Sequence, residues 1–280
     1  MKDIKGKSAL LTGGSRGLGP YIARTLAKEG VNIAVAARTK DALEALAREL
    51  TEFNVRAIAI ASDITDDASR ENLVEQVKAE FGHIDILVNN AGIEYVSRYA
   101  GLSPDFIQTM IHTNLVAPMI LTRLVLPHML ERGSGHIVTM SSLGGKKGSP
   151  YSATYAATKA GLIEWTRGLR EELRSTGVSA SVICPGFVSE AGMFAVYNKS
   201  APKVVGETTP GKVADAVLRS IKKDVGEISV TPGPIMPLAI LDAISPEAVA
   251  WILRTLGVYD FYRKQADENE RASGVYRGQA

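Results

Sequence analysis

Three residues in the middle of the chain have the types and spacing of an acid–base site. Tyr155 and Lys159 are four positions apart in Ala153–Leu173, whose pattern predicts a helix, so both side chains leave one face. A nearby ammonium favours the ionised phenol and would lower its pKa from about 10 toward the range of a general acid or base. Ser142 could then hydrogen-bond the substrate oxygen that Tyr155 protonates. By chance alone, exposed helix residues and an unrelated serine give the same pattern.

A glycine-rich turn near the N-terminus is the second chemical signal. The apolar run Lys7–Thr12 predicts a buried strand, and Tyr21–Glu29 predicts a helix. A strand, a glycine turn and a helix in this order are the context of a dinucleotide-binding loop. The glycines allow the tight turn, the approach of backbone amides to a pyrophosphate, and close packing of the helix on the sheet. The loop residues expected at the cofactor are Gly13, Ser15, Arg16, Gly17, Leu18 and Gly19.

Composition narrows the function classes. The 280-residue chain can bury a substantial core. Its net charge of +2 is too small to create the positive potential that attracts nucleic acid. Its single cysteine, Cys184, lies in an apolar run, so we expect it in the core, with no disulfide and no metal cluster. Charged residues interrupt the N-terminus and the apolar stretch Ile235–Leu256, so we expect no signal peptide, no membrane span and a cytoplasmic location.

Strands alternate with helical patterns along the chain. Their apolar character without alternation fits a parallel sheet that is covered on both faces. With right-handed crossovers, the prediction is a single doubly wound α/β domain of the Rossmann type, with its ligand beyond the carboxyl ends of the strands. The remaining predicted strands are Val31–Ala37, Val55–Ala61, Ile84–Val88, His136–Met140, Val178–Cys184 and Glu227–Val230, and the remaining helices are Asp41–Leu50, Asp66–Phe81, Pro104–Leu130 and Val213–Ile221.

The candidate residues all fall at the carboxyl ends of predicted strands, where such a ligand would lie. They are the Thr12 loop, Arg38, Asp63, Asn90, Ser142 and the pair Pro185-Gly186. We expect residues 1–233 to form the catalytic domain and 234–266 a helical extension, in which Pro246 opens an apolar helix, that is either a lid or a subunit interface. Pro232, Pro234 and Pro237 would stop the last strand, and the polar segment 267–280 predicts a loose tail.

Together these motifs resemble the short-chain dehydrogenase/reductase family over about residues 5–233. The residues that carry the resemblance are Thr12-Gly13-x-x-x-Gly17-x-Gly19, Asp63, Asn89-Asn90-Ala91-Gly92, Asn114, Ser142, Tyr155-x-x-x-Lys159 and Pro185-Gly186.

The resemblance implies a catalytic tetrad of Asn114, Ser142, Tyr155 and Lys159. Tyr155 would be the acid/base and Ser142 would orient the carbonyl. Lys159 would hold the nicotinamide ribose hydroxyls and lower the pKa of Tyr155, and Asn114 would position a water that links Lys159 to solvent. Asn114 is a poor residue for a helix interior, so a local kink would fit this role, while a helix break near Pro118 is the alternative.

The resemblance also implies cofactor contacts, and charge indicates which cofactor. The family places Asp63 and Ile64 at the adenine, Asn90 along the cofactor, and the Val188 backbone at the carboxamide. An acidic residue at the end of the second strand would bind the ribose 2′-hydroxyl of NAD. Here that strand ends at Arg38, and Arg16 lies in the glycine loop. Two guanidinium groups pair well with a 2′-phosphate, so NADP is predicted over NAD.

One departure from the family pattern lies after Pro185-Gly186. Glu190 occupies the position where the family often has a threonine that bonds the carboxamide, so either the contact is lost or Ser189 supplies it. Glu190 could instead belong to a substrate loop. That loop and its neighbours suggest an apolar pocket, with ordinary packing as the equal alternative; the residues are Met193, Phe194, Tyr197, Tyr95 and Leu143.

The predicted function is an NADP-dependent oxidoreductase that interconverts a carbonyl and a secondary alcohol. The substrate could be a 3-oxoacyl thioester, a steroid-like ketone or another hydrophobic carbonyl compound. A homodimer or homotetramer is the assembly that the resemblance implies. The alternative is a catalytically silent NADP-binding sensor or scaffold protein of the same fold. The complete tetrad favours the enzyme, and the unusual Glu190 is the one feature in favour of the alternative.

Overall fold

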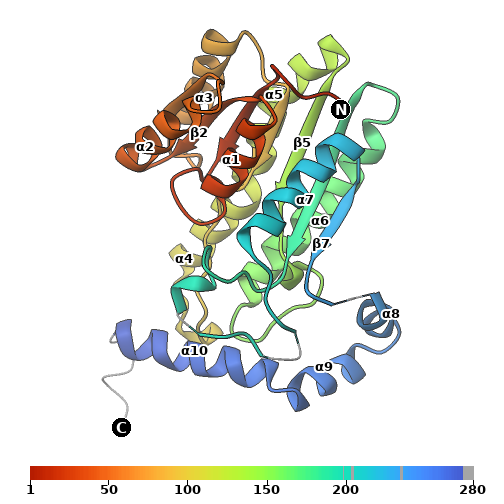
Figure 1. The fold of residues 1–280 in the computed structure, drawn as a ribbon. Helices are drawn as coiled ribbons and strands as arrows, with labels where there is room; N and C mark the ends of the chain where they lie inside the picture. The colour runs from red at the N-terminus through yellow and green to blue at the C-terminus, as the bar shows by residue number, and fades with distance from the viewer. Residues whose placement is uncertain (198, 203–204, 234–235, 274–280) are drawn as a thin grey trace.

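The computed structural model describes residues 1–197, 199–202, 205–233 and 236–273, and their central element is one parallel sheet (Figure 1). Its strands follow the order β3-β2-β1-β4-β5-β6-β7. Because every neighbouring pair is parallel, the carboxyl ends of all strands lie at one edge of the sheet. The strands are β1 (Ser8–Thr12), β2 (Asn32–Ala37), β3 (Ala57–Ala61), β4 (Ile86–Asn89), β5 (Gly135–Met140), β6 (Val178–Pro185) and β7 (Glu227–Val230).

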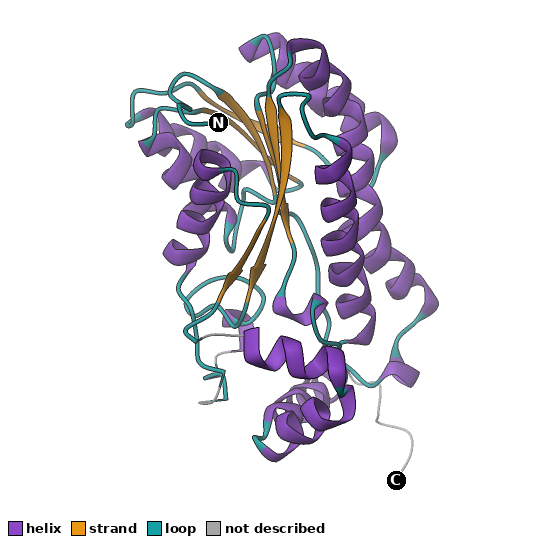
Figure 2. Cartoon of the chain, turned by 90° about the vertical axis from the view of Figure 1, so that its right-hand side faces the viewer, coloured by secondary structure: helices purple, strands orange, loops and turns teal. Residues whose placement is uncertain are grey.

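Helices cover both faces of the sheet, which confirms the predicted doubly wound α/β fold (Figure 2). The helices α1 (Gly19–Lys28), α2 (Lys40–Thr51) and α7 (Pro210–Lys223) pack on the first face. The helices α3 (Asp67–Phe81), α5 (Ala117–Arg132) and α6 (Ala153–Glu172) pack on the second face.

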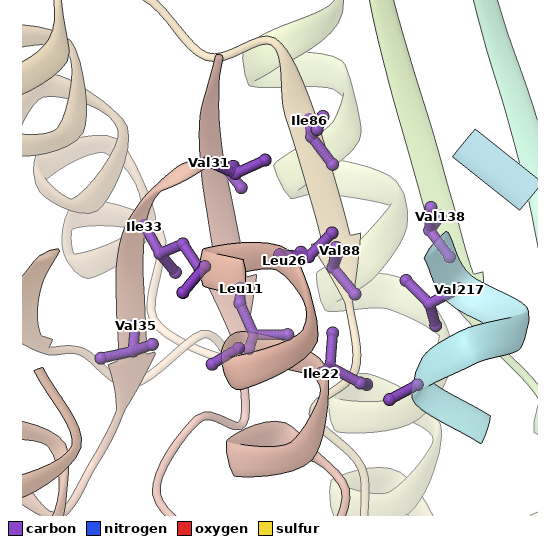
Figure 3. Packing of buried hydrophobic residues seen from close by; sticks show 14 of the residues in the cluster. Leu11, Ile22, Leu26, Val31, Ile33, Val35, Ile86, Val88, Val138 and Val217 are labelled. Atoms are coloured by element: carbon purple, nitrogen blue, oxygen red, sulfur yellow. The ribbon is translucent and has the colours of Figure 1, made fainter. Parts of the chain in front are cut away.

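Successive strand residues supply the two cores in turn. Leu11 and Val35 face the helices of the first face. Their neighbours in that core include Ile22 of α1 and Val217 of α7 (Figure 3). Leu10, the residue before Leu11 in β1, belongs to the core of the second face. Both cores are apolar, which is why the strands show no alternation of apolar and polar residues. The predicted core position of Cys184 is confirmed, since its side chain is fully buried.

Several helices begin where the sequence offers a capping side chain. Asp66 accepts a hydrogen bond from the Ser69 amide at the start of α3, at 2.7 Å. Thr209 caps α7 in the same way, with Pro210 in the first turn. Such caps satisfy backbone amides that have no partner within the helix, and proline in the first turn loses nothing there. They fix where each connection ends and the helix begins.

The last crossover differs in hand from the prediction. The connections β4–α5–β5 and β5–α6–β6 advance across the sheet with their helices on the second face. The connection β6–α7–β7 advances in the same direction, but α7 packs on the first face, so its hand is opposite. Right-handed crossovers are the strong general preference. Here α7 packs against α1, and the chain reaches it through the long segment 186–209, which passes the glycine loop on the way.

The predicted helical region from Pro104 is interrupted once. It consists of α4 (Pro104–Ile111), a π-helical turn (His112–Val116) and α5. By length and composition alone, Pro104–Arg132 could span a membrane. Core helices of globular proteins pass the same test, and Leu121, Val125 and Met129 of α5 are buried in the core of the second face.

The C-terminal helices lie beyond the carboxyl edge of the sheet (Figures 1 and 2). They are α8 (Met236–Ile244), α9 (Pro246–Thr255) and α10 (Val258–Ser273). The predicted loose tail from residue 267 is therefore wrong up to Ser273, because α10 continues and Glu270 is buried. Polar composition is misleading here, since polar side chains of α10 form ion pairs with Arg98, far away in the chain. Pro234 and residues 274–280 lie outside the described residues.

Candidate active site

One cavity of about 1650 Å³ lies along the carboxyl edge of the sheet. Its walls come from the loops after β1, β2, β3, β4, β5 and β6, and from the C-terminal helices. Most of the predicted site residues line it: Gly13, Ser15, Arg16, Gly17, Leu18, Arg38, Asp63, Ile64, Asn90, Ser142, Tyr155, Lys159 and Val188. The other two predicted residues, Gly19 and Asn114, are buried and do not line the cavity. A volume above the usual range for one small ligand, about 300–1,000 Å³, allows two molecules side by side.

The glycine loop leaves no room for side chains at its critical positions. Gly13 and Gly17 have φ of 69° and 65°, in the left-handed region that favours glycine. A Cβ on Gly19 would lie 2.2 Å from the Gly13 carbonyl oxygen, so only glycine lets α1 begin this close to the turn. The resulting cradle of backbone at the N-terminus of α1 is the kind of site that binds phosphate.

Asn90 and Thr12 hold the glycine loop to the end of β4. The Asn90 side-chain amide donates to the carbonyl oxygens of Thr12 and Gly13, at 3.0 and 3.1 Å. The Thr12 hydroxyl accepts from the backbone amides of Asn90 and Ala91, at 3.1 and 3.2 Å. In this structure the Asn90 amide therefore positions the loop, a supporting role that the motif alone did not indicate.

The loops after β2 and β3 form the cationic end of the cavity. Arg16 and Arg38 line it, and no carboxylate of the described residues forms an ion pair with either guanidinium. Asp63 accepts hydrogen bonds from the Thr65 amide and hydroxyl, at 2.9 and 2.7 Å, and these bonds lower the pKa of its carboxyl. Both guanidinium groups are thus available to an anionic ligand.

Ser142, Tyr155 and Lys159 meet at the centre of the cavity. Ser142 follows β5 and accepts a hydrogen bond from the Gly144 amide at 3.1 Å, while its hydroxyl also interacts with the Tyr155 phenol. Lys159, one turn after Tyr155 on α6, places its ammonium 5.6 Å from the centre of the Tyr155 ring. The same ammonium donates to the Met140 carbonyl at 2.9 Å. Helical spacing therefore aligns Tyr155 with Lys159, and the turn after β5 brings Ser142 to them.

Asn114 lies in the π-helical turn between α4 and α5, which is the irregularity predicted there. It is fully buried, and its side-chain amide exchanges two hydrogen bonds with the Ile93 backbone, both 2.8 Å. A Cβ on Gly92 would lie 3.3 Å from Asn114 Oδ1 and 3.4 Å from Lys159 Nζ, so both groups flank this glycine. A π turn at a functional site commonly serves to aim one side chain.

The pKa of Tyr155 differs from the expectation. Burial raises it well above 10.0, the Glu94 carboxylate adds to the rise, and the Ser142 hydroxyl opposes it. Burial also lowers the pKa of Lys159 from 10.5 to about 8. The predicted lowering by Lys159 is therefore wrong for the chain by itself, because desolvation outweighs the pairing of the two groups. A cationic cofactor ring, which the prediction also invoked, would act in the opposite sense.

Glu94 is a cavity residue that the sequence analysis missed. It follows β4, and its Oε1 accepts a hydrogen bond from the Ser152 hydroxyl at 2.7 Å. Its charge also raises the pKa of Tyr197 and Tyr262, so the carboxylate lies among phenols from three separate parts of the chain. An acidic residue two positions after Gly92, directly after an apolar isoleucine, was the only available signal.

The segment after β6 closes one side of the cavity. Glu190 has φ of 64° and an exposed side chain, and Ser189 donates its hydroxyl to the Thr208 carbonyl at 3.2 Å. The Ser189 hydroxyl is thus already engaged within the segment. A Cβ on Gly17 would lie 3.4 Å from Gly192 Cα, so this segment packs directly against the glycine loop.

Helix α10 closes the other side of the cavity through aromatic and polar contacts. The Phe261 ring lies 5.6 Å from Phe187 and 5.8 Å from Phe194, measured between ring centres. Arg98, in the loop after β4, pairs with Asp267 at 2.6 Å and with Glu270. The Asn269 side chain donates to the Val96 carbonyl at 2.8 Å. Through these contacts the end of α10 packs against the loop after β4, which also contains Glu94.

Comparison with known proteins defines the class. A family model of short chain dehydrogenases matches residues 7–201. The chain belongs to the short-chain dehydrogenase/reductase family and is an oxidoreductase enzyme, as the resemblance predicted.

Two curated relatives are more specific. The chain is 45% identical over 272 residues to the ketoacyl reductase HetN of Nostoc sp., with 95% of each chain covered. It is 33% identical to the 3-oxoacyl-[acyl-carrier-protein] reductase FabG of Escherichia coli over 214 residues, which are 76% of this chain and 86% of that protein.

Solved structures agree with the fold. A metagenomic short-chain oxidoreductase in complex with NADP is 30% identical with a TM-score of 0.71, covering 83% of this chain and all of that one. A variant of the actinorhodin polyketide ketoreductase with NADPH is 32% identical with a TM-score of 0.73, covering 80% of this chain and 95% of that one.

Proposed function

We propose that this enzyme is an NADP-dependent ketoreductase that interconverts a carbonyl and a secondary alcohol on a hydrophobic substrate. The observation that carries the proposal is the meeting of Ser142, Tyr155 and Lys159 in one cavity, between the glycine cradle and an aromatic wall. The relatives named ketoacyl reductase and ketoreductase support the same reaction. Glu190, the one feature in favour of the silent sensor or scaffold, has an exposed side chain, and no further observation on the described residues favours that alternative.

The residues present fit NADP. The pyrophosphate fits the backbone cradle at Gly13 and Gly17, where positive φ angles and the lack of Cβ atoms leave the amides accessible. Arg16 and Arg38 would hold the 2′-phosphate, and Asp63 with Ile64 the adenine. The ribose hydroxyls would lie at Tyr155 and Lys159, and the carboxamide at the Val188 backbone. When bound, this cofactor supplies the hydride for the carbonyl carbon.

The side chains at the centre of the cavity would manage the oxygen and its proton. The Ser142 hydroxyl and the Tyr155 phenol both hydrogen-bond the carbonyl oxygen, which places developing negative charge against two donors. Tyr155 Oη gives up its proton as that charge forms, and the Lys159 ammonium stabilises the resulting phenolate. Lys159 would regain protons through a water held near Asn114, since the Asn114 side chain and the Lys159 ammonium both flank Gly92.

An apolar substrate is supported by the wall opposite the glycine cradle. Phe187, Phe194 and Phe261 pack on one another there, and Leu238, Val249 and Leu253 of the C-terminal helices also line the cavity. We therefore assign residues 236–273 as a lid over the substrate part of the site. A homodimer or homotetramer and a cytoplasmic location stay predictions.

The proposal is tested by following the oxidation of NADPH, and separately of NADH, with carbonyl compounds from diketones to 3-oxoacyl thioesters and steroid ketones. We expect turnover with a preference for NADPH and for apolar substrates. Binding of NADPH without turnover of any compound on the panel would favour the sensor or scaffold and contradict the proposal.

A further inference from the structure

Glu94 is an acidic group inside the substrate part of the cavity. It follows Ile93, whose backbone is fixed by Asn114, and its carboxylate is held by Ser152 at 2.7 Å. It acts on Tyr155 and Lys159 of α6, on Tyr197 of the segment after β6 and on Tyr262 of α10. Glu94 lines the same cavity as Tyr155 and Lys159, its partner Ser152 lies three residues before Tyr155, and a Cβ on Gly92 would lie 3.4 Å from Lys159 Nζ. The carboxylate is therefore close to where the reacting carbonyl would lie.

The protein compensates this charge only in part. A carboxylate has about four acceptor positions, and among the described residues only the Ser152 hydroxyl donates to Glu94. Lys159 attracts the carboxylate, but its ammonium already donates to the Met140 carbonyl at 2.9 Å. In a cavity walled by aromatic rings, a charge with few partners acts strongly on whatever enters.

The other lysines that line this cavity offer no counter-charge to an acidic substrate. Lys146 is paired with Glu227, and Lys147 with Asp242. A substrate carboxylate close to the reacting carbonyl would therefore meet a like charge, and Lys159, which Glu94 also attracts, is the one lysine of the described lining that is not paired with a carboxylate.

We propose that Glu94 selects the substrate by charge, admitting uncharged carbonyl compounds such as esters, thioesters and amides and excluding free oxo acids. This inference rests on the proposed ketoreductase activity and names the substrate class of the same site. Two like charges a few ångströms apart in a partly dehydrated site repel strongly enough to change kcat/KM about a hundredfold.

The selection depends on pH in a defined direction. Burial raises the pKa of Glu94, while Ser152 and Lys159 oppose the rise. Exclusion of an anion is therefore weakest where Glu94 is protonated and grows as the pH rises through the Glu94 pKa. The other titratable groups that face Glu94 are Lys159, Tyr155, Tyr197 and Tyr262. Lys159, whose pKa is lowered to about 8, attracts an anionic substrate while it is charged, so it adds to the pH dependence in the same direction. The part that belongs to Glu94 is the part that disappears in Glu94→Gln.

The experiment compares 3-oxooctanoate with its primary amide, which has nearly the same shape and no charge. With NADPH as the reductant, we expect the wild-type enzyme to prefer the amide by about fiftyfold or more at pH 9, and by less at pH 6. Glu94→Gln keeps the size of the side chain and an acceptor for Ser152. It should reduce the preference to about fivefold or less and remove the part of the pH dependence that belongs to the Glu94 carboxylate.

Two control variants separate charge from structure. Ser152→Ala removes the hydrogen bond but keeps the carboxylate, and Glu190→Gln removes an exposed carboxylate from the rim of the same cavity. Both should retain the wild-type preference at high pH, and in Ser152→Ala the preference should appear at a higher pH, because the lost hydrogen bond had opposed the rise in the Glu94 pKa. Equal preference in wild type and Glu94→Gln, with turnover of the amide, would overturn the role of Glu94 alone. If neither compound nor any other carbonyl were reduced, the proposed function would fail first, and the selection with it.

Discussion

The two walls of the cavity are built in different ways. The cofactor wall depends on backbone geometry within short segments: Gly13, Gly17 and Gly19 shape the turn, and Asn90 ties it to the next strand. The substrate wall depends on side chains from segments far apart in the chain, such as Phe187 and Phe261. A backbone cradle tolerates almost no change at its glycines, whereas an aromatic wall can be rebuilt with other residues of similar volume.

On the proposed function, this difference would allow substitutions to change the substrate while the cofactor stays the same. The segment between β6 and α7 packs against the glycine loop, and α10 contacts the loop after β4. The substrate wall therefore lies over the glycine cradle. Changes in the overlying segments would alter specificity without disturbing the cradle. The comparison predicts that variants in the two walls affect different measurements.

The largest effect is expected at Gly19. In Gly19→Ala the added methyl group would lie 2.2 Å from the Gly13 carbonyl oxygen, so the turn has to open. A backbone clash of this kind costs about 3 kcal/mol or more, and we expect NADPH affinity to fall about a hundredfold or more in a fluorescence titration. Gly148→Ala is the matched control, because nothing lies within 4 Å of its Cβ position. Unchanged affinity in Gly19→Ala would show that the cradle does not bind the cofactor.

A smaller effect is expected at Arg38. Arg38→Gln removes a guanidinium that would pair with the 2′-phosphate, so the ratio of kcat/KM for NADPH over NADH should fall about thirtyfold. Activity with NADH should change little. Lys40→Gln, a nearby residue paired with Glu44, should leave the ratio as it is. An unchanged ratio in Arg38→Gln would mean that other groups distinguish the 2′-phosphate of NADPH from the 2′-hydroxyl of NADH.

The smallest effect is expected in the substrate wall. Phe261→Ala removes a ring that packs on Phe187 and Phe194, so KM for a large apolar ketone should rise about tenfold while NADPH affinity stays the same. Trp251→Ala changes an aromatic residue of α9 that is 63% exposed and serves as the control. A parallel loss of NADPH affinity in Phe261→Ala would show that the substrate wall also binds the cofactor, which contradicts the separation of the two walls.

Most of the fold and the cofactor wall could be predicted from the sequence. Apolar strands, capped helices and the glycine turn are local features, and Tyr155 and Lys159 share a face because of helical spacing. Several other features could not be predicted from the sequence, because they depend on contacts between segments that are far apart in the chain. Glu94, the seating of α10 on Arg98, and the hand of the last crossover belong to this group.

The sequence was also misleading where burial competes with charge. Spacing alone puts the Lys159 ammonium near Tyr155 and suggests a lowered phenol pKa. In the structure, desolvation dominates both groups, and the unforeseen Glu94 raises the Tyr155 pKa further. The extent of burial is a property of the whole fold, so no motif could supply it.

Tyr155→Phe tests most directly whether the two walls meet at a reaction centre. The variant lacks only the phenol oxygen and with it one ribose contact, so NADPH affinity in a fluorescence titration should fall by no more than about fivefold, while the rate of carbonyl reduction in a single turnover falls about a thousandfold. Loss of the rate with retained binding is the result that we predict. A single-turnover rate equal to that of the wild type would contradict the assignment of Tyr155 as the proton donor.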